Sequence, residues 1–149
     1  ASPPRPVSTI AFQQADGGPT TLAAYKGSGV VLNFWATWCA PCVREMPSLL
    51  RLGDRLAGDG VRVLPLSEDR KGAPVVRKFY RQHGLEAFPV LIDPKGKVLR
   101  ASAVRGLPTT LLIDENGREV GRVTGPLEWD SEDAITLVRA CIGNKPGKP

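Results

Sequence analysis

The chain has 149 residues, of which 42% are hydrophobic and 23% are charged, and this balance excludes an intrinsically disordered protein. Its longest apolar run, at 30–35, is far shorter than the ~20 residues that a membrane-spanning helix needs. The formal net charge is +5, but the basic residues are scattered and no aromatic-rich basic motif accompanies them, so we expect no nucleic-acid partner.

The first half of the chain alternates between strand and helix patterns. The proline-rich ends, ASPPRP and NKPGKP, lead us to expect flexible tails at 1–8 and 144–149 of a single domain that spans 1–149. Between the tails, apolar β-rich runs predict buried strands, and amphipathic stretches that end at glycine predict helices. The elements predicted here are a strand at 30–35 (VVLNFW), a helix at 40–57, a strand at 61–66 (VRVLPL) and a helix at 73–84.

The second half opens with two similar stretches, PVLIDPKGKV at 89–98 and PTTLLIDENGREV at 108–120. Each combines a proline, a strand run and a glycine turn, and the Asn-Gly turn of the second predicts a β-hairpin. The segment KVLRASAV favours a short helix, and a final helix is expected from Asp130 or Ser131 to about Cys141. Because strands alternate with helices and the hairpin adds antiparallel strands, the predicted class is α/β with a mixed central sheet flanked by helices.

The densest group of basic residues surrounds the second predicted helix. A solvated helix face is the simpler interpretation of such a group, and docking to an acidic partner is the alternative. The group consists of Arg70, Lys71, Arg77, Lys78 and Arg81.

Two of the three cysteines form a C-x-x-C motif within WATWCAPC at 35–42. Three cysteines cannot all pair within one chain, so a multi-disulfide scaffold is excluded. A closed zinc site needs four ligands, and the sequence lacks a second closely spaced pair beside Cys39 and Cys42. The remaining candidate ligands are His83 and Cys141, and we expect Cys141 to be a buried free thiol.

Redox chemistry accounts better for the motif than a structural role, because a C-x-x-C disulfide closes too small a loop to stabilise the fold much. Cys39 follows a predicted strand and begins a predicted helix, whose N-terminus favours the thiolate. In such motifs the thiol pKa can fall to ~3.5–7.5. Cys42 lies one helical turn further on and can attack a mixed disulfide formed at Cys39, which releases the product.

Three segments, NFWATWCAPC, REMPSL and GLPTTLLID, resemble the thioredoxin superfamily, and in particular its TlpA/ResA-type thiol-disulfide oxidoreductases. The resemblance covers roughly 20–141 and implies a thioredoxin-like fold with an inserted helix–strand segment at about 68–100. It also implies an enzyme, a protein disulfide reductase, that acts on a disulfide-containing client protein and receives electrons from a membrane thiol donor. Family clients include apocytochrome c and copper-centre assembly proteins of cytochrome oxidase. The resemblance therefore implies a role in either cytochrome c maturation or copper-centre assembly and does not decide between them.

The resemblance further implies roles for individual residues. Cys39 would be the nucleophile, Cys42 the resolving thiol and Pro108 the cis-proline that faces the disulfide. We expect the peptide bond before Pro108 to be cis and the bond before Pro89 to be trans. Substrate contacts are expected from Trp38, Ala40, Pro41, Leu107 and Thr109.

One position departs from the thioredoxin pattern. Thioredoxins bury an aspartate where this sequence has Asn33, and an amide cannot carry a proton between reacting groups. ResA-like members instead place a carboxylate after the second strand, where this chain has SEDR. We therefore expect Glu68 to accept the proton of the resolving thiol, with Asp69 as the second candidate.

We expect no metal and no cofactor beyond the redox-active disulfide of Cys39 and Cys42, and a monomeric protein. The same residues would serve an oxidant that introduces disulfides, and two soft thiolates could hold Cu(I) in a metallochaperone. Because the chain begins at Ala1 rather than at Met, we expect that an upstream segment was removed, and a signal peptide and a membrane anchor are both open. The expected location is periplasmic or extracytoplasmic.

Overall fold

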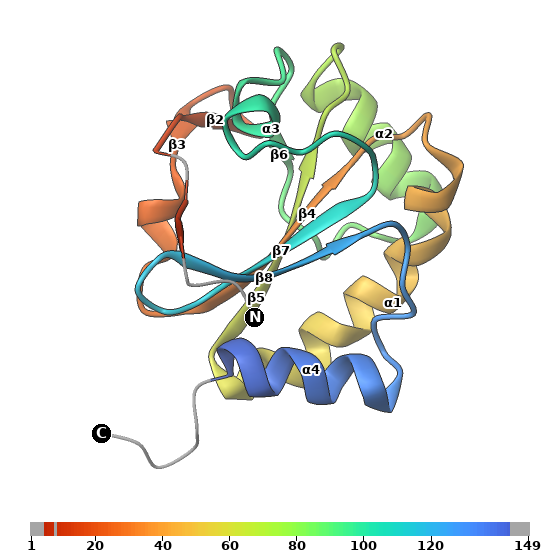
Figure 1. The fold of residues 1–149 in the computed structure, drawn as a ribbon. Coiled ribbons are helices and arrows are strands. Elements are labelled where there is room, and N and C mark those ends of the chain that lie inside the picture. Colours follow the sequence, from red (N-terminus) through yellow and green to blue (C-terminus); the bar gives the residue numbers. More distant parts are fainter. Residues whose placement is uncertain (1–4, 8, 144–149) are drawn as a thin grey trace.

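The computed structural model describes residues 5–7 and 9–143, which form a mixed sheet with helices on both faces (Figure 1). The described strands, in sheet order, are β1 (Arg5–Pro6), β8 (Arg118–Thr124), β7 (Thr109–Ile113), β4 (Gly29–Trp35), β5 (Val61–Ser67), β6 (Leu91–Ile92), β2 (Phe12–Gln14) and β3 (Pro19–Thr20). The α-helices are α1 (Ala40–Leu56), α2 (Ala73–His83), α3 (Lys97–Ala101) and α4 (Glu132–Ile142). The predicted α/β class is confirmed.

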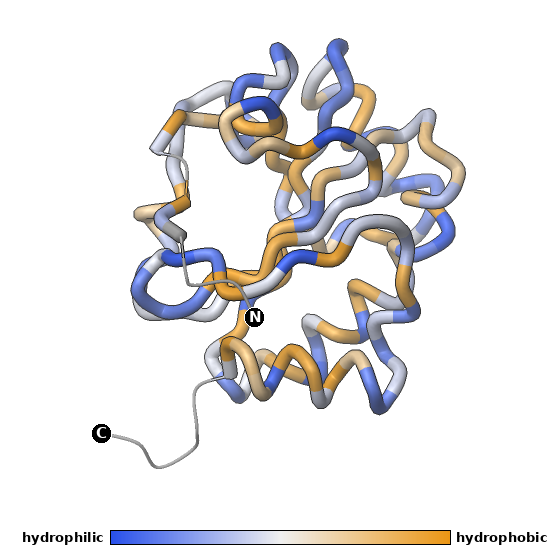
Figure 2. The backbone as a smooth tube through the Cα atoms, viewed as in Figure 1, coloured by the Kyte–Doolittle hydropathy of each residue, from blue (hydrophilic) through white to orange (hydrophobic). Residues whose placement is uncertain are grey.

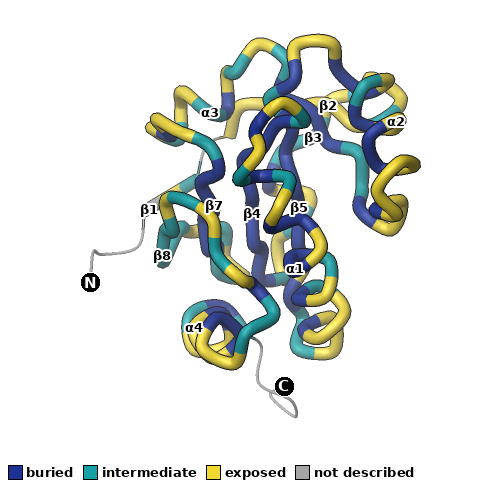
Figure 3. The backbone as a smooth tube through the Cα atoms, turned by 90° about the vertical axis from the view of Figure 1, so that its right-hand side faces the viewer, coloured by how far each residue is buried: buried dark blue, intermediate teal, exposed yellow. Residues whose placement is uncertain are grey.

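β4 lies at the centre of the sheet, where it pairs in parallel with β5 and antiparallel with β7. All of its residues are buried, as expected for an apolar run that is covered on both faces (Figure 3). Its side chains alternate between two cores. Val31 and Trp35 face the core to which α1, α2 and α4 contribute, whereas Leu32 and Phe34 face the core that contains Val98 of α3. Hydrophobic residues accordingly gather on the central strands (Figure 2).

The long helices begin and end close to the predicted residues. α1 buries the face that carries Cys42 and Leu49 against the sheet and exposes the opposite face (Figure 3). α4 is capped by Ser131, whose hydroxyl accepts a hydrogen bond from the Ala134 N–H at 3.2 Å, so one of the two predicted caps is confirmed. None of the helices in the described part of the chain combines the length and the apolar character that crossing a membrane requires.

The N-terminal region corrects the sequence analysis. Residues 1–8 were expected to form a tail, but Arg5–Pro6 form β1, which pairs antiparallel with β8. The short elements β2, β3 and the 3-10 helix η1 (Leu22–Tyr25) were not predicted. Pairing of β2 with β6 and burial of Phe12 and Leu22 hold these elements in place. The sequence did not predict them because a strand of two or three residues is too short to show a periodic pattern. Residues 1–4 and 8, and the predicted tail at 144–149, lie outside the described residues.

The segment predicted as an insert at about 68–100 contains α2, β6 and α3. β6 pairs in parallel with β5 and antiparallel with β2, so the insert extends the sheet on the side of β5. The two stretches that look alike in sequence differ in structure, because 89–98 contributes a strand of only two residues whereas 108–120 contributes β7 and the turn into β8. The insert brings α3 and the loop after β5 to the end of the sheet where α1 begins.

Candidate active site

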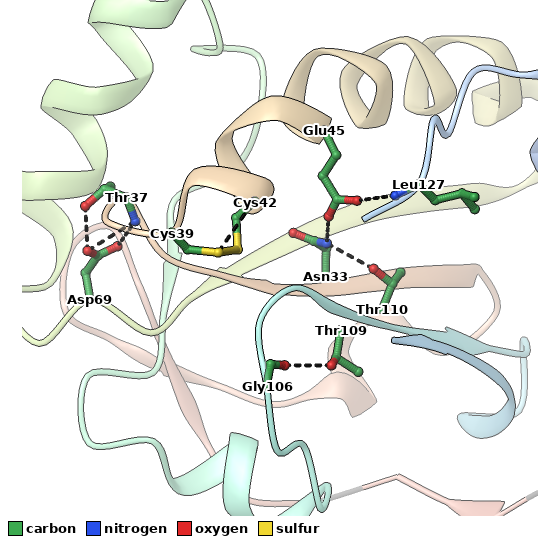
Figure 4. The surroundings of a disulfide bond; sticks show 10 residues. All are labelled: Asn33, Thr37, Cys39, Cys42, Glu45, Asp69, Gly106, Thr109, Thr110 and Leu127. Carbon is green, nitrogen blue, oxygen red and sulfur yellow. Dashed lines mark hydrogen bonds between the residues drawn. A yellow bond between two sulfur atoms is a disulfide. The ribbon is translucent and has the colours of Figure 1, made fainter. Parts of the chain in front are cut away.

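Cys39 and Cys42 form a disulfide where the chain passes from β4 into α1 (Figure 4). Cys39 is the N-cap residue of α1, and its sulfur accepts the backbone N–H of Cys42 at 3.4 Å. The N-terminus of a helix favours negative charge, so this position stabilises a thiolate at Cys39 when the bond is open. Cys39 is 7% exposed and Cys42 is fully buried, so an incoming sulfur can reach only Cys39 directly.

The turn that leads into the disulfide is held by Asp69. The Asp69 carboxylate accepts the backbone N–H of Thr37 at 3.0 Å and the Thr37 hydroxyl at 2.6 Å. It also accepts the hydroxyl of Ser67 at 2.7 Å (Figure 4 shows the Thr37 bonds). Asp69 is therefore a buried anchor between β5 and the segment before Cys39, and its oxygens are already occupied.

The loop before β7 faces the same end of α1. The Leu107–Pro108 peptide bond is cis, as predicted, and Phe88–Pro89 is not among the cis bonds of the described residues. The loop is closed by two hydrogen bonds, from the Thr109 hydroxyl to the Gly106 carbonyl at 2.7 Å and from the Gly125 N–H to the Pro108 carbonyl at 2.8 Å (Figure 4 shows the first).

A groove of about 600 Å³ lies beside Cys39. It is lined by the start of α1, the loop after β5, Leu99 of α3 and the loop that contains the cis-proline. We call this hollow the groove. Four of the five predicted substrate-contact residues line it, namely Trp38, Ala40, Pro41 and Leu107. Thr109 does not, because its side chain is buried and its hydroxyl is bonded to Gly106.

Glu68 also lines the groove, so the structure brings it to the same hollow as Cys39. Burial is the main cause that raises the pKa of Glu68 to about 10, and the neighbouring carboxylate of Asp93 raises it further. The positive charge of Arg100 offsets part of this rise. One oxygen of Glu68, Oε2, is buried without a hydrogen-bond partner in the described part of the chain. At neutral pH this carboxyl group therefore holds a proton.

Sequence reasoning missed the buried carboxyl group of Glu45, which follows Cys42 by three residues on α1. Its oxygens accept hydrogen bonds from the side-chain amide of Asn33 at 2.8 Å, the Leu127 N–H at 3.0 Å and the Trp129 indole N–H at 3.0 Å (Figure 4 shows the first two). Burial raises the pKa of Glu45, and these three donors partly offset the rise. Residues three apart on a helix are neighbours, so Glu45 lies on the face that carries Cys42.

The other residues weighed as metal ligands lie apart from the disulfide. His83 stacks on Phe79 at the end of α2, with ring centroids 4.0 Å apart, and Cys141 is a half-buried free thiol on α4. Among residues 5–7 and 9–143, no group of three or more His, Cys, Asp or Glu side chains is placed to hold a metal ion.

Comparison with known proteins gives one family and a consistent set of relatives. The profile of the AhpC/TSA family matches residues 5–118. The thiol-disulfide oxidoreductase ResA of Geobacillus thermodenitrificans is 43% identical over 114 residues, which cover 75% of this chain and 63% of that protein. The chain thus spans less than two thirds of the length of such curated relatives.

Solved structures agree with the sequence relatives. A Chlorobium tepidum protein described as a thiol:disulfide interchange protein DsbE superposes with a TM-score of 0.84 at 30% identity, covering 95% of this chain and 99% of that one. The exposed lipoprotein thioredoxin of Streptococcus pneumoniae superposes with a TM-score of 0.71 at 32% identity, covering 87% and 96%. These likenesses confirm the thioredoxin-like fold and the resemblance to ResA-type proteins.

Proposed function

The chain belongs to the AhpC/TSA family, and we propose that it is a thiol-disulfide oxidoreductase that reduces disulfides of client proteins outside the cytoplasm. The observation that carries the proposal is the disulfide of Cys39 and Cys42 at the start of α1, beside an open groove. The relatives named ResA and DsbE support the same chemistry.

The reaction starts from the reduced pair. The Cys39 thiolate attacks one sulfur of a client disulfide, a bond forms between Cys39 and that sulfur, and the second client sulfur leaves as a thiolate. The helix N-terminus and the N–H of Cys42 lower the cost of the charge on Cys39. Because Cys39 is the partly exposed member of the pair, it takes the role of nucleophile.

The second step releases the client. The Cys42 thiolate attacks the sulfur of Cys39, the mixed disulfide breaks, and the client leaves with both of its sulfurs reduced. The protein is left with the Cys39–Cys42 disulfide, so two electrons have passed from the protein to the client. Cys42 must first lose its proton, and a fully buried thiolate is costly without a nearby base.

We assign the role of base for Cys42 to Glu45. It shares the buried face of α1 with Cys42, and its raised pKa brings it closer to that of a thiol, which favours proton transfer. Glu68 cannot serve as this base at neutral pH, because a carboxyl group with a pKa of about 10 is already protonated. Its position in the groove suits the opposite role, as the acid that protonates the client thiolate that leaves in the first step.

The loop with the cis-proline provides a place for the client backbone. Within the part of the chain that the structure describes, the backbone N–H and C=O of Leu107 have no hydrogen-bond partner, and Leu107 lines the groove. An extended client segment can pair with these two groups in the manner of an added strand. Such pairing holds a disulfide over Cys39 and does not depend on the client sequence.

A catalyst of this kind needs a source of electrons. We propose a membrane thiol donor that reduces the Cys39–Cys42 disulfide, with apocytochrome c or a copper-centre assembly protein as the client. The exposed lipoprotein among the structural neighbours supports an extracytoplasmic location. The disulfide itself is the redox group, without a further cofactor, and the protein works as a monomer.

The redox state in the native host tests whether the protein is a reductant. Alkylation of trapped cell extracts should show Cys39 and Cys42 reduced in a host that has its membrane donor and oxidised in a host that lacks it. A disulfide that persists in both hosts would contradict the proposal and favour an oxidant that introduces disulfides.

A further inference from the structure

An exposed tryptophan lies at the edge of the groove. Trp38 is 71% exposed, which is unusual for a large aromatic side chain, and it immediately precedes the reactive Cys39. Trp38 lines both the groove and a second hollow of about 580 Å³, which also contains Lys71 and Val75. Trp38, Glu68 and Arg70 thus border both hollows. Exposed apolar surface of this kind favours binding of a polypeptide segment over solvent.

The charged groups at this surface are mainly basic. Arg70 follows β5 and Arg105 precedes the cis-proline, so they reach the groove from two different segments of its lining. Both are exposed, and in the described part of the chain neither has an ion-pair or hydrogen-bond partner. They differ in this respect from Arg122 and Arg139, which pair with Glu119 and Asp59.

The acidic residues near the groove do not neutralise these arginines. The carboxylate of Asp69 is buried and bonded to Thr37 and Ser67. Glu68 is uncharged at neutral pH, because burial and Asp93 raise its pKa to about 10. Two cations and an exposed tryptophan therefore surround Cys39 without an exposed acid among the residues that line the groove.

We propose that the groove selects client segments that carry acidic residues next to the reactive cysteine, which pair with Arg70 and Arg105 while apolar client side chains contact Trp38. This inference rests on the proposed disulfide reductase function and adds a client class to it. The backbone of Leu107 accepts any extended segment, so the two arginines provide the sequence preference. The pairs that form are solvent-exposed, so salt weakens them.

The test uses three synthetic peptides with the same C-x-x-C disulfide, flanked by Glu, by Gln or by Lys. The reduced protein is mixed with each peptide, and the second-order rate constant is measured in about 20 mM and about 300 mM salt. The Arg70→Gln/Arg105→Gln variant is compared with Lys78→Gln/Arg81→Gln, which removes two charges from exposed residues of α2 that do not line the groove. Taking the ratio of two peptides on one protein cancels any change in the reactivity of Cys39.

The wild-type protein and the control variant should reduce the Glu peptide roughly 5- to 20-fold faster than the Lys peptide at low salt. That ratio should fall below about 2-fold in the Arg70→Gln/Arg105→Gln variant and should shrink for wild type at high salt. The client preference would be overturned if wild type reduced all three peptides at equal rates, or if the Arg70→Gln/Arg105→Gln variant kept the wild-type ratio of Glu to Lys peptide. Neither result would contradict the reductase function. Failure to reduce any of the peptides would instead contradict the reductase function itself.

Discussion

The side-chain amide of Asn33 donates a hydrogen bond of 2.8 Å to the carboxylate of Glu45, in the buried space between β4 and α1. Asn33 also donates to the Thr110 hydroxyl at 3.0 Å, so it links α1 to β7 through the strand between them. An aspartate at this position would set two carboxyl groups against each other. Because position 33 is an asparagine, the Glu45 carboxyl group is bonded to a neutral amide instead of facing a second acid.

Asn33→Asp should therefore destabilise the protein at neutral pH by about 2–3 kcal/mol, because two buried carboxylates repel each other. Each carboxyl group then has a raised pKa in the folded state, so the lost stability returns as the pH falls and one of them is protonated. Urea unfolding of the oxidised protein at pH 5 and pH 8 measures this difference. Asn33→Leu, which removes the amide without adding charge, serves as the control, and an equal pH dependence in both variants would refute the explanation.

Glu45→Gln should slow the second step of the reaction roughly 10- to 100-fold at neutral pH, because Cys42 loses its proton acceptor. The first step, attack by Cys39, should change by less than about 3-fold. Rapid quenching of a single turnover with a peptide disulfide resolves the two steps, since the mixed disulfide should accumulate in the variant. Arg44→Gln, a change at the exposed neighbouring residue, should leave both steps unchanged. Loss of both steps together in Glu45→Gln would show that Glu45 acts only by holding the structure.

Glu68→Gln should slow the first step roughly 10-fold, because the leaving client thiolate loses its proton donor in the groove. A client disulfide with a leaving thiol of low pKa needs no proton and should be reduced at the wild-type rate. Asp69→Asn should alter the rates much less, because the Asp69 carboxylate is bonded to Thr37 and Ser67 and does not line the groove. A slowing of Glu68→Gln that is the same for every leaving group would argue against proton donation.

The same carboxyl group makes stability depend on pH. The pKa of Glu68 is about 10 in the folded protein against 4.5 ordinarily, so its contribution to stability is fully present below about pH 4.5 and is lost as the pH rises toward 10. Glu68→Gln has no such group to lose its proton. Its free energy of unfolding should therefore exceed that of wild type by on the order of 1–2 kcal/mol at pH 8, after discounting for partial exposure. Denaturant unfolding at pH 5, 7 and 9 measures the gap, with the exposed Glu128→Gln as control. A gap that does not widen with pH would contradict the raised pKa.

The central sheet and the long helices were predictable because each carries its own signal. The apolar run at 30–35 needs burial on both faces, and the Leu-rich stripe of α1 needs a core to face. The Asn-Gly turn before β8 fixes a hairpin locally, and Gly117 has the positive φ that such a turn requires. These elements follow from period and turn chemistry, which do not depend on distant parts of the chain.

The remaining features depend on contacts between distant residues. β1 and β2 are defined by the strands that they pair with, and nothing in their two or three residues indicates a partner. Glu45 follows the exposed Arg44, and a charged residue on a helix is ordinarily interpreted as solvent-facing. Its burial results from the segment that carries Leu127 and Trp129, which lies some eighty residues further along the chain and supplies two of its hydrogen-bond donors.

Trapping of the mixed disulfide shows directly whether Cys39 is the nucleophile and Cys42 the resolving thiol. Cys42→Ser should form a stable mixed disulfide with a client peptide through Cys39, because the resolving thiol is absent, and Cys39→Ser should form none. The difference in exposure, 7% against full burial, predicts the same order when the reduced wild-type protein is alkylated, with Cys39 modified first. Trapping by Cys39→Ser rather than by Cys42→Ser, together with faster alkylation of Cys42, would contradict these two roles.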